Sequence, residues 1–381
     1  MMSQTKTETT RPRRRRIIDY NSPAVQDEVN NITHGTFVKQ GTMIAFPTGF
    51  PGASIPILAD ESHITALDTS RQNFVYGGTS GKRAHIFVGM FHGVTGMILD
   101  MHTAEGATEC TAVCCGKINL LACVNGPNGG GRILTSHLEP WPYDLIQEWG
   151  FQRHPFDDLG EAASGEPIVH AVADSSRDHA VGVTTHHLFT VDFANPKIQA
   201  VEEVSGCGRL ALGSKGGVFG SDGAGHLWRF DVQAGKLQRE AVKLPEGGWS
   251  KAPQVWARVP NTGLLYTVDD DGRLFSFDEQ RGFSASLGKT MFTPVTCMAA
   301  TFDGRVFGSC GDGIAKMFCY DPRRPQEVTD LGVAVSLFER RRYGYLFGAA
   351  VTGRDGEIVF GEDDDGGHLW LYFPRIQAGS A

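Results

Sequence analysis

Seven basic residues recur at one position of an internal repeat, and they carry most of the chemistry that this sequence offers. Each follows a glycine-rich or acidic turn and precedes an apolar segment. Imidazole can bind a metal or transfer a proton near neutral pH, whereas guanidinium and ammonium groups bind carboxylates. The seven residues are His85, Arg132, His187, His226, Arg273, Lys316 and His368.

The repeat that positions these residues consists of two apolar segments joined by a tight turn. Two clear copies read VFGSDGAGHLW (218–228) and VFGEDDDGGHLW (359–370). Glycine accepts the positive φ of tight turns, so each copy predicts a β-hairpin. The basic positions are separated by 47, 55, 39, 47, 43 and 52 residues. This period is typical of a four-stranded propeller blade of roughly 40–50 residues.

We therefore predict an all-β fold, a seven-bladed β-propeller over residues 36–376. Residues 1–35 are expected to form a flexible basic tail and lead-in, and 377–381 a short tail. The last blade ends near Phe373 after three strands, and segment 36–46 is expected to supply its fourth. This pairing would close the ring and remove an exposed sheet edge.

Repeat symmetry places the seven basic residues in a ring on one face, around the central funnel. A basic ring on an acidic protein favours an anionic ligand, although such residues also serve as simple turn chemistry. Other residues are expected near the same funnel. They are His63 before the first inner strand, and Arg341, Tyr343 and Tyr345 near the end of the sixth blade.

Composition and charge exclude several classes of protein. The net charge is −8, and a basic cluster lies within the first 16 residues, so the remaining chain is more acidic still. This argues against nucleic-acid binding, which needs a basic face. The sequence has no stretch of about 18 apolar residues and no apolar segment typical of a secretion signal, so we expect a cytoplasmic protein without membrane contact. We expect the closely spaced cysteines to be buried thiols, namely Cys110, Cys114, Cys115 and Cys123.

Residues 60–375 resemble the seven-bladed β-propeller polysaccharide and oligosaccharide lyases, such as the ulvan lyases and the oligogalacturonate lyases, in architecture and in the funnel rich in His, Arg and Tyr. The resemblance implies β-elimination, in which a uronate loses its C5 proton and its C4 substituent. A cation must neutralise the carboxylate, a base must take the proton, and an acid must protonate the leaving oxygen.

The resemblance implies candidate residues for each role without choosing among them. Arg132, Arg273, Lys316 or a metal would neutralise the carboxylate. The base would be His85, His187 or His226, and the acid Tyr343 or Tyr345. The expected substrate contacts are His63, His85, Arg132, Lys316 and Arg341.

Two other functions remain open at this stage. His187, His226 and His368 could instead hold a divalent metal such as Mn, Fe, Zn or Ni, and the acidic turns could bind Ca. A metal-dependent hydrolase or lactonase would then result. The third possibility is a non-catalytic interaction scaffold whose basic ring is only turn chemistry. For an enzyme, the expected partner is an anionic small molecule or oligosaccharide.

Overall fold

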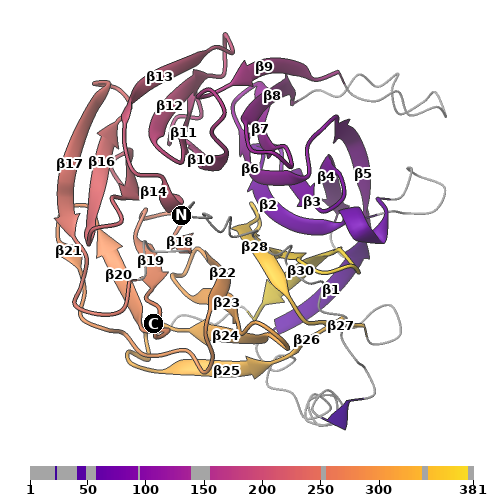
Figure 1. Ribbon diagram of the computed structural model, residues 1–381. Helices are drawn as coiled ribbons and strands as arrows, with labels where there is room; N and C mark the ends of the chain where they lie inside the picture. Colours follow the sequence, from indigo (N-terminus) through magenta and orange to yellow (C-terminus); the bar gives the residue numbers. More distant parts are fainter. Residues whose placement is uncertain are drawn as a thin grey trace, which may run out of the picture.

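The chain forms a seven-bladed β-propeller, as the repeat predicts. The computed structural model describes residues 22–23, 41–48, 57–92, 95–138, 155–249, 255–336 and 342–375. Seven four-stranded antiparallel sheets surround a central axis in the order of the sequence (Figure 1). Most of the predicted N-terminal tail, segment 36–40 and the C-terminal residues 376–381 lie outside the described residues.

In each of blades 1–6, four consecutive strands run from the centre outward. Blade 1 contains β2 (His63–Thr69), β3 (Val75–Ser80), β4 (Ala84–His92) and β5 (Thr95–Ala104). Blade 2 contains β6 (Glu109–Cys115), β7 (Asn119–Asn125), β8 (Gly131–His137) and β9 (Asp157–Glu161). Blade 3 contains β10 (Ile168–Ala173), β11 (His179–Thr184), β12 (His187–Asp192) and β13 (Ile198–Glu203).

The same pattern continues around the ring. Blade 4 contains β14 (Cys207–Leu212), β15 (Gly217–Ser221), β16 (His226–Asp231) and β17 (Lys236–Lys243). Blade 5 contains β18 (Trp256–Arg258), β19 (Leu265–Val268), β20 (Leu274–Asp278) and β21 (Gly282–Phe283). Blade 6 contains β22 (Val295–Ala300), β23 (Val306–Cys310), β24 (Lys316–Tyr320) and β25 (Val328–Gly332).

Blade 7 joins the two ends of the chain, which confirms the predicted closure. Its inner strands are β28 (Phe347–Thr352), β29 (Ile358–Glu362) and β30 (His368–Pro374). Its outer strand is β1 (Gly41–Pro47), which is antiparallel to β30 from Gly41 opposite Pro374 to Pro47 opposite His368. This pairing of the N-terminal strand with the last strand of the chain closes the ring.

A glycine and an aromatic ring explain why the repeat keeps its pattern. Gly182 lies opposite Phe189, and Gly220 lies opposite Trp228. A Cβ atom at either glycine would overlap the ring of its partner, so only glycine fits beneath it. The second strand therefore supplies the space that the aromatic residue of the third strand fills.

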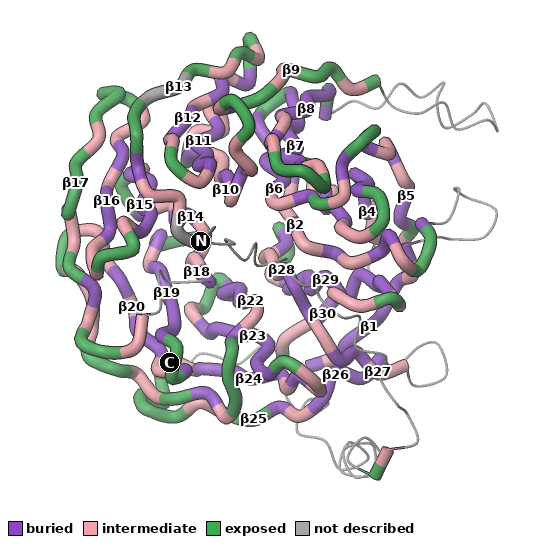
Figure 2. The backbone as a smooth tube through the Cα atoms, viewed as in Figure 1, coloured by how far each residue is buried: buried purple, intermediate pink, exposed green. Residues whose placement is uncertain are grey.

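The hydrophobic core is divided into layers between neighbouring blades. One layer joins Tyr76 and Ile86 of blade 1 to Leu120 of blade 2. The exposed residues lie mainly at turns and on outer strands such as β17 (Figure 2). Blade 2 contributes Cys110 and Cys115 to one layer and Cys114 and Cys123 to the next. These four are buried free thiols, and burial raises the pKa of Cys123 to about 12.

Two segments were not predicted from the sequence. Residues 157–161 form β9, the outer strand of blade 2. Its polar sequence conceals the strand, because an outer strand has little apolar surface to bury. A short ribbon of β26 (Ala334–Val335) and β27 (Tyr343–Gly344) also lies between blades 6 and 7. The described residues contain no helix long and apolar enough to cross a membrane.

Candidate functional site

All seven ring residues lie at the start of the third strand of their blades. His187, for example, begins β12, and Arg273 directly precedes β20. We call the face with the turns between second and third strands the ring face. Neighbouring strands are about 4.8 Å apart, so a third strand lies roughly 10 Å outside the first. The ring residues therefore surround the central channel at a distance.

His187 of blade 3 is held by a carboxylate from the loop that precedes its blade. Its Nδ1 lies 2.9 Å from Oε1 of Glu166. Burial raises the pKa of Glu166, but hydrogen bonds from Thr184, His187 and the His186 backbone outweigh this and lower it. The His187 side chain is 35% exposed, and no described residue forms a hydrogen bond to its Nε2. One imidazole nitrogen therefore remains open to a ligand.

The ring residues of blades 4 and 5 share this arrangement. The Nδ1 of His226 lies 3.5 Å from Oδ2 of Asp222, and its side chain is 32% exposed. No hydrogen bond to its Nε2 comes from the described residues. Nη2 of Arg273 lies 2.6 Å from Oδ2 of Asp269, and the arginine side chain is 34% exposed. Blades 3, 4 and 5 thus present three accessible groups in a row.

His85 of blade 1 is enclosed instead. Its Nδ1 lies 3.0 Å from Asp100 and its Nε2 lies 3.0 Å from Glu61, with the imidazole 4% exposed. Arg83 also donates to both oxygens of Glu61, at 2.7 and 2.8 Å. Burial lowers the pKa of His85, but its hydrogen bonds and the charges of Asp100 and Glu61 outweigh this and raise it. Both imidazole nitrogens of His85 are already engaged.

The junction of blades 7 and 1 is also closed by ion pairs. Nδ1 of His368 lies 3.2 Å from Glu362, and this histidine is 10% exposed. His63 of blade 1 reaches Asp363 and Asp365 after β29 of blade 7, at 3.1 Å each. The hydrogen bond to Asp363 is the largest effect that raises the pKa of His63. His63 therefore links the first blade to the last.

The remaining predicted residues have separate surroundings. Arg132 pairs with Asp158 at 2.7 Å, and Lys316 lies 3.5 Å from Asp330. Tyr345 is 1% exposed, and its ring centroid lies 6.4 Å from that of the half-buried Tyr343. Arg341 lies outside the described residues.

The structure does not bring the predicted metal ligands together. In the described part of the chain, no group of three or more His, Cys, Asp or Glu side chains is arranged to hold a metal ion. His187, His226 and His368 begin third strands of blades 3, 4 and 7, and each lies beside its own carboxylate. Local pairing within each blade thus replaces the convergence that the sequence suggested.

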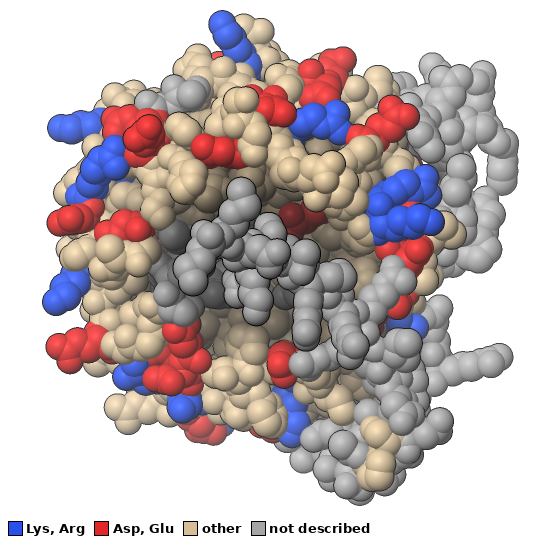
Figure 3. Space-filling model, in the orientation of Figure 1, with Lys and Arg blue, Asp and Glu red and all other residues tan. Residues whose placement is uncertain are grey.

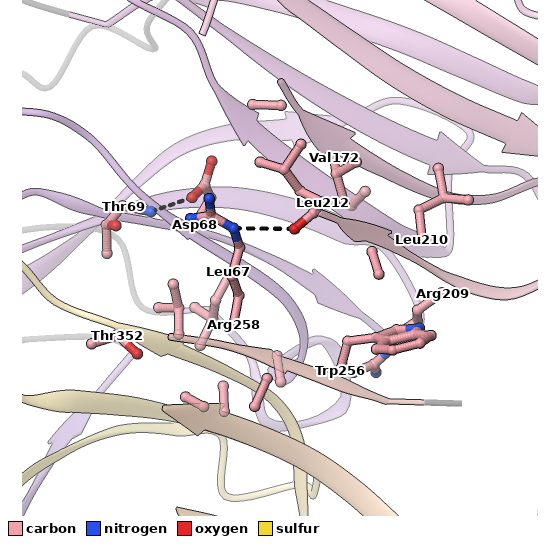
Figure 4. A pocket seen from close by; sticks show the side chains of 18 of the residues that line it. Leu67, Asp68, Thr69, Val172, Arg209, Leu210, Leu212, Trp256, Arg258 and Thr352 are labelled. Carbon is pink, nitrogen blue, oxygen red and sulfur yellow. Dashed lines mark hydrogen bonds between the residues drawn. The ribbon is translucent and has the colours of Figure 1, made fainter. Parts of the chain in front are cut away.

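A central cavity of about 460 Å³ is formed by the innermost strands, and none of the predicted site residues lines it (Figure 4). Four arginines and two aspartates contribute to its lining. They are Arg177, Arg209, Arg258, Arg354, Asp68 and Asp174. Sequence reasoning missed this site. The available signal was an arginine within short, otherwise uncharged inner strands, as in Cys207–Leu212 and Trp256–Arg258.

Arg209 is the first residue of β14 that lines this cavity, and its side chain crosses the channel. Its Nη2 donates a hydrogen bond of 2.7 Å to the Gly348 carbonyl, which joins blade 4 to the non-adjacent blade 7. On the neighbouring blade, Nδ1 of His170 accepts the Leu210 N–H at 3.1 Å. Burial, followed by the charge of Arg209, lowers the pKa of His170 to about 3. His170 is therefore neutral and carries its proton on Nε2.

On the face shown in Figure 3, the described residues form no continuous basic band. In the face shown in Figure 3, acidic and basic side chains are interspersed around the rim. A ligand that prefers basic groups would therefore be selected by local arrangements, such as the ring residues or the cavity arginines, because mixed surface charges largely cancel at a distance.

Structural comparison agrees with the fold. A streptogramin B lyase structure aligns with 88% of this chain and 99% of its own, at 11% identity and a TM-score of 0.62. Virginiamycin B lyase from Staphylococcus aureus aligns with 84% of this chain and 97% of its own, at 11% identity and a TM-score of 0.60. No family model and no curated protein matches the sequence.

A third similar structure is a catalytically inactive histidine-to-alanine variant of the same Staphylococcus aureus enzyme with quinupristin. It aligns with 88% of this chain and 99% of its own, at 9% identity and a TM-score of 0.59. At this level of identity the three structures establish a shared propeller architecture.

Proposed function

We propose that this protein is a β-eliminating lyase whose site lies on the ring face of blades 3, 4 and 5. The observation that carries the proposal is the set of three accessible groups. His187 and His226 each direct Nδ1 toward a carboxylate and leave Nε2 open, and Arg273 follows on the next blade. A carboxylate that orients an imidazole in this way is typical of histidines that transfer protons.

The order of the three residues suits the order of the reacting groups on a uronate. Arg273 binds the carboxylate and so acidifies the adjacent C–H bond. His226 takes the C5 proton through Nε2, the electron pair forms the C4–C5 double bond, and the C4–O bond breaks. His187, whose Nδ1 faces Glu166, gives a proton from Nε2 to the leaving oxygen. C4, C5 and the carboxylate lie on one sugar ring, so the proposal requires the three side chains from neighbouring blades to converge on that ring.

The propeller lyases with similar folds support an elimination reaction, and the inactive histidine variant of one of them is consistent with a histidine role. The two alternatives have less support. A metal-dependent hydrolase would need a ligand group, and the described residues contain none of three or more members. A scaffold would favour a continuous apolar patch, but the exposed large apolar residues lie on separate segments, namely Leu58, Met97, Ile118, Phe292 and Phe302.

The test is the ultraviolet absorbance of the unsaturated product. Purified protein is mixed with a panel of uronate oligosaccharides, and with quinupristin as a non-saccharide comparison, each with and without a chelator. We expect a rising signal from a uronate substrate that the chelator leaves unchanged. His226→Asn should remove the signal, while His186→Asn, at an exposed histidine beside the ring, should retain it. Absence of unsaturated product across the panel would contradict the proposal.

A further inference from the structure

We propose that the central cavity is a second site, which binds a small carboxylate or phosphate anion through Arg258 and Arg209. The cavity holds about 460 Å³, a volume within the usual range for small-molecule sites. It shares no lining residue with the ring, so the inference is independent of the proposed lyase.

The cavity opens on the face opposite the ring. Its lining includes the ends of the first strands and the turns that follow, where Ser175 and Arg354 are exposed. Arg258 ends β18 near this opening, and Arg209 lies in the middle of β14. Arg209 precedes Leu212 by three residues on β14, which is roughly 10 Å along the channel at about 3.3 Å per residue. Leu212 accepts the Arg258 Nε–H, so Arg258 contacts the channel wall about that far from the Arg209 backbone. A small anion can enter from one side and reach both levels.

Three of the four cavity arginines, Arg209, Arg258 and Arg354, form no ion pair with a carboxylate in the described part of the chain, and of these Arg209 and Arg258 are half-buried. Arg258 donates its Nε–H to the Leu212 carbonyl at 3.1 Å, and Arg209 donates to the Gly348 carbonyl. By contrast, Arg177 lies 3.4 Å from Asp68. A partly buried cation without an anion has lost part of its hydration, and a bound anion would offset that cost.

The groups around Arg258 strengthen its need for an anion. Burial, followed by the nearby charge of Arg177, lowers the pKa of Arg258. The two aspartates of the lining are already engaged. Asp68 accepts N–H groups from Thr69 and Cys115, and Asp174 accepts N–H groups from Asp178 and His179. The positive charge of the cavity is therefore available to a ligand.

The walls limit the ligand to a compact molecule with an apolar part. Each of the seven inner strands contributes a buried alanine, and these small side chains leave the channel open. They are Ala66, Ala112, Ala171, Ala211, Ala257, Ala299 and Ala349. Neutral His170 offers an N–H donor in the same lining, and Trp256 offers an aromatic surface. A short dicarboxylate or a phosphate monoester fits this combination of a few donors and apolar walls.

The test uses inorganic phosphate and succinate as probes, with sodium chloride at matched ionic strength as the control. Titration calorimetry of the full chain should give saturable binding of at least one probe, and thermal unfolding should shift upward with that probe. Arg258→Gln should weaken the binding at least about tenfold, because it removes a charge-assisted contact. The matched control is Arg239→Gln, at an exposed arginine on outer strand β17 that pairs with Glu202.

A second measurement checks whether Arg258→Gln has lost binding because its fold is damaged. Without added anion, Arg258→Gln should unfold at the same or a higher temperature than the wild type, because it removes a partly buried charge that has no carboxylate partner among the described residues. His226→Asn, on the ring face, should bind the probes as the wild type does. Saturable binding by neither probe, or equal binding by wild type and Arg258→Gln, would overturn the inference.

Discussion

Blades 3 to 5 and the junction of blades 7 and 1 use the same repeat position in opposite ways. His187 and His226 are about one-third exposed, and each lies beside one carboxylate. His85 and His368 are almost completely covered. His85 lies between two carboxylates, one of which also binds Arg83. An accessible histidine and an enclosed one thus arise from one structural position.

The junction of blades 7 and 1 also carries a contact that joins the two ends of the propeller. Blade 7 takes its outer strand from the N-terminal side of the chain, so the junction with blade 1 must hold segments distant in sequence. His63 and Asp363 are 300 residues apart and are joined by a hydrogen bond of 3.1 Å. Blades 3 to 5 are consecutive in the sequence and need no such ties. Their ring residues are therefore available for a ligand.

Two glutamates make the comparison direct. Glu61 and Glu166 both lie two residues before the first strand of a blade, and each binds the ring histidine of that blade. Glu61 is 1% exposed and is shared with Arg83, whereas Glu166 faces a more open histidine. The same contact is therefore structural in blade 1 and is expected to be functional in blade 3.

The largest effect should come from removing an accessible imidazole. We expect His226→Asn to lower kcat/KM on the responsive uronate substrate by about 10²–10⁴-fold, because a general base contributes that much. Unfolding temperature should change little, since the side chain is one-third exposed. The matched variant in the other region is His368→Asn, which should lower stability and leave turnover per folded molecule unchanged. Equal losses of turnover in both variants would remove the distinction between the two regions.

The next effect is on stability and compares the two glutamates. Glu61→Gln leaves His85 and Arg83 without their shared charge, so we expect a loss of about 3–5 kcal/mol in the free energy of unfolding. Glu166→Gln, at the matching position of blade 3, should cost less than about 1 kcal/mol, because its histidine pair is partly exposed. Urea unfolding measures both. If the two variants lost similar free energies of unfolding, burial of the glutamate would not explain the difference between the two regions.

The sequence predicted the architecture because the hairpin pattern of the second and third strands recurs in each of the seven blades. The pairing of glycine with an aromatic ring, as at Gly220 and Trp228, recurs with the period of a blade. The outer strand β9 was missed because its sequence is polar and does not belong to the repeated hairpin pattern.

The surroundings of the candidate residues could not be predicted in the same way. The sequence placed His85 and His187 at equivalent positions, but it did not indicate that Glu61 and Asp100 enclose the first while the second stays open. The two carboxylates lie 15 and 24 residues from His85, and only the folded blade shows that both reach it. The cavity was missed for a related reason, since Arg209 matters only because it reaches across to Gly348 of blade 7.

A smaller effect should follow from weakening the contact that holds an accessible imidazole than from removing the imidazole. Glu166→Gln keeps a hydrogen-bond acceptor near Nδ1 of His187 but removes the carboxylate charge that faces it. We expect kcat/KM to fall about tenfold, which is 1.4 kcal/mol, and the pH dependence of turnover to change. An unchanged pH profile with reduced turnover would indicate that Glu166 supports the fold instead of positioning the proton donor.

The smallest effect concerns the pH dependence of stability, which should originate from the closed region. The pKa values of His85 and His63 are raised above their ordinary value of 6.5, so the folded protein binds more protons than the unfolded chain. Their contribution is complete below pH 6.5 and is lost as pH rises through the raised pKa values. The pKa of Glu61 is lowered from 4.5, so its contribution is present above that pH and disappears in acid.

Unfolding free energies measured across this range can therefore test the closed region alone. The wild type should weaken as pH rises above 6.5, and His85→Gln should show a shallower decline, because one of the two raised groups is gone. His63→Gln should act in the same direction, and the double variant should lose most of the slope, since the two histidines have separate carboxylate partners. A wild-type slope that persists in the double variant would place the titrating groups elsewhere and would remove the electrostatic explanation for the closed junction.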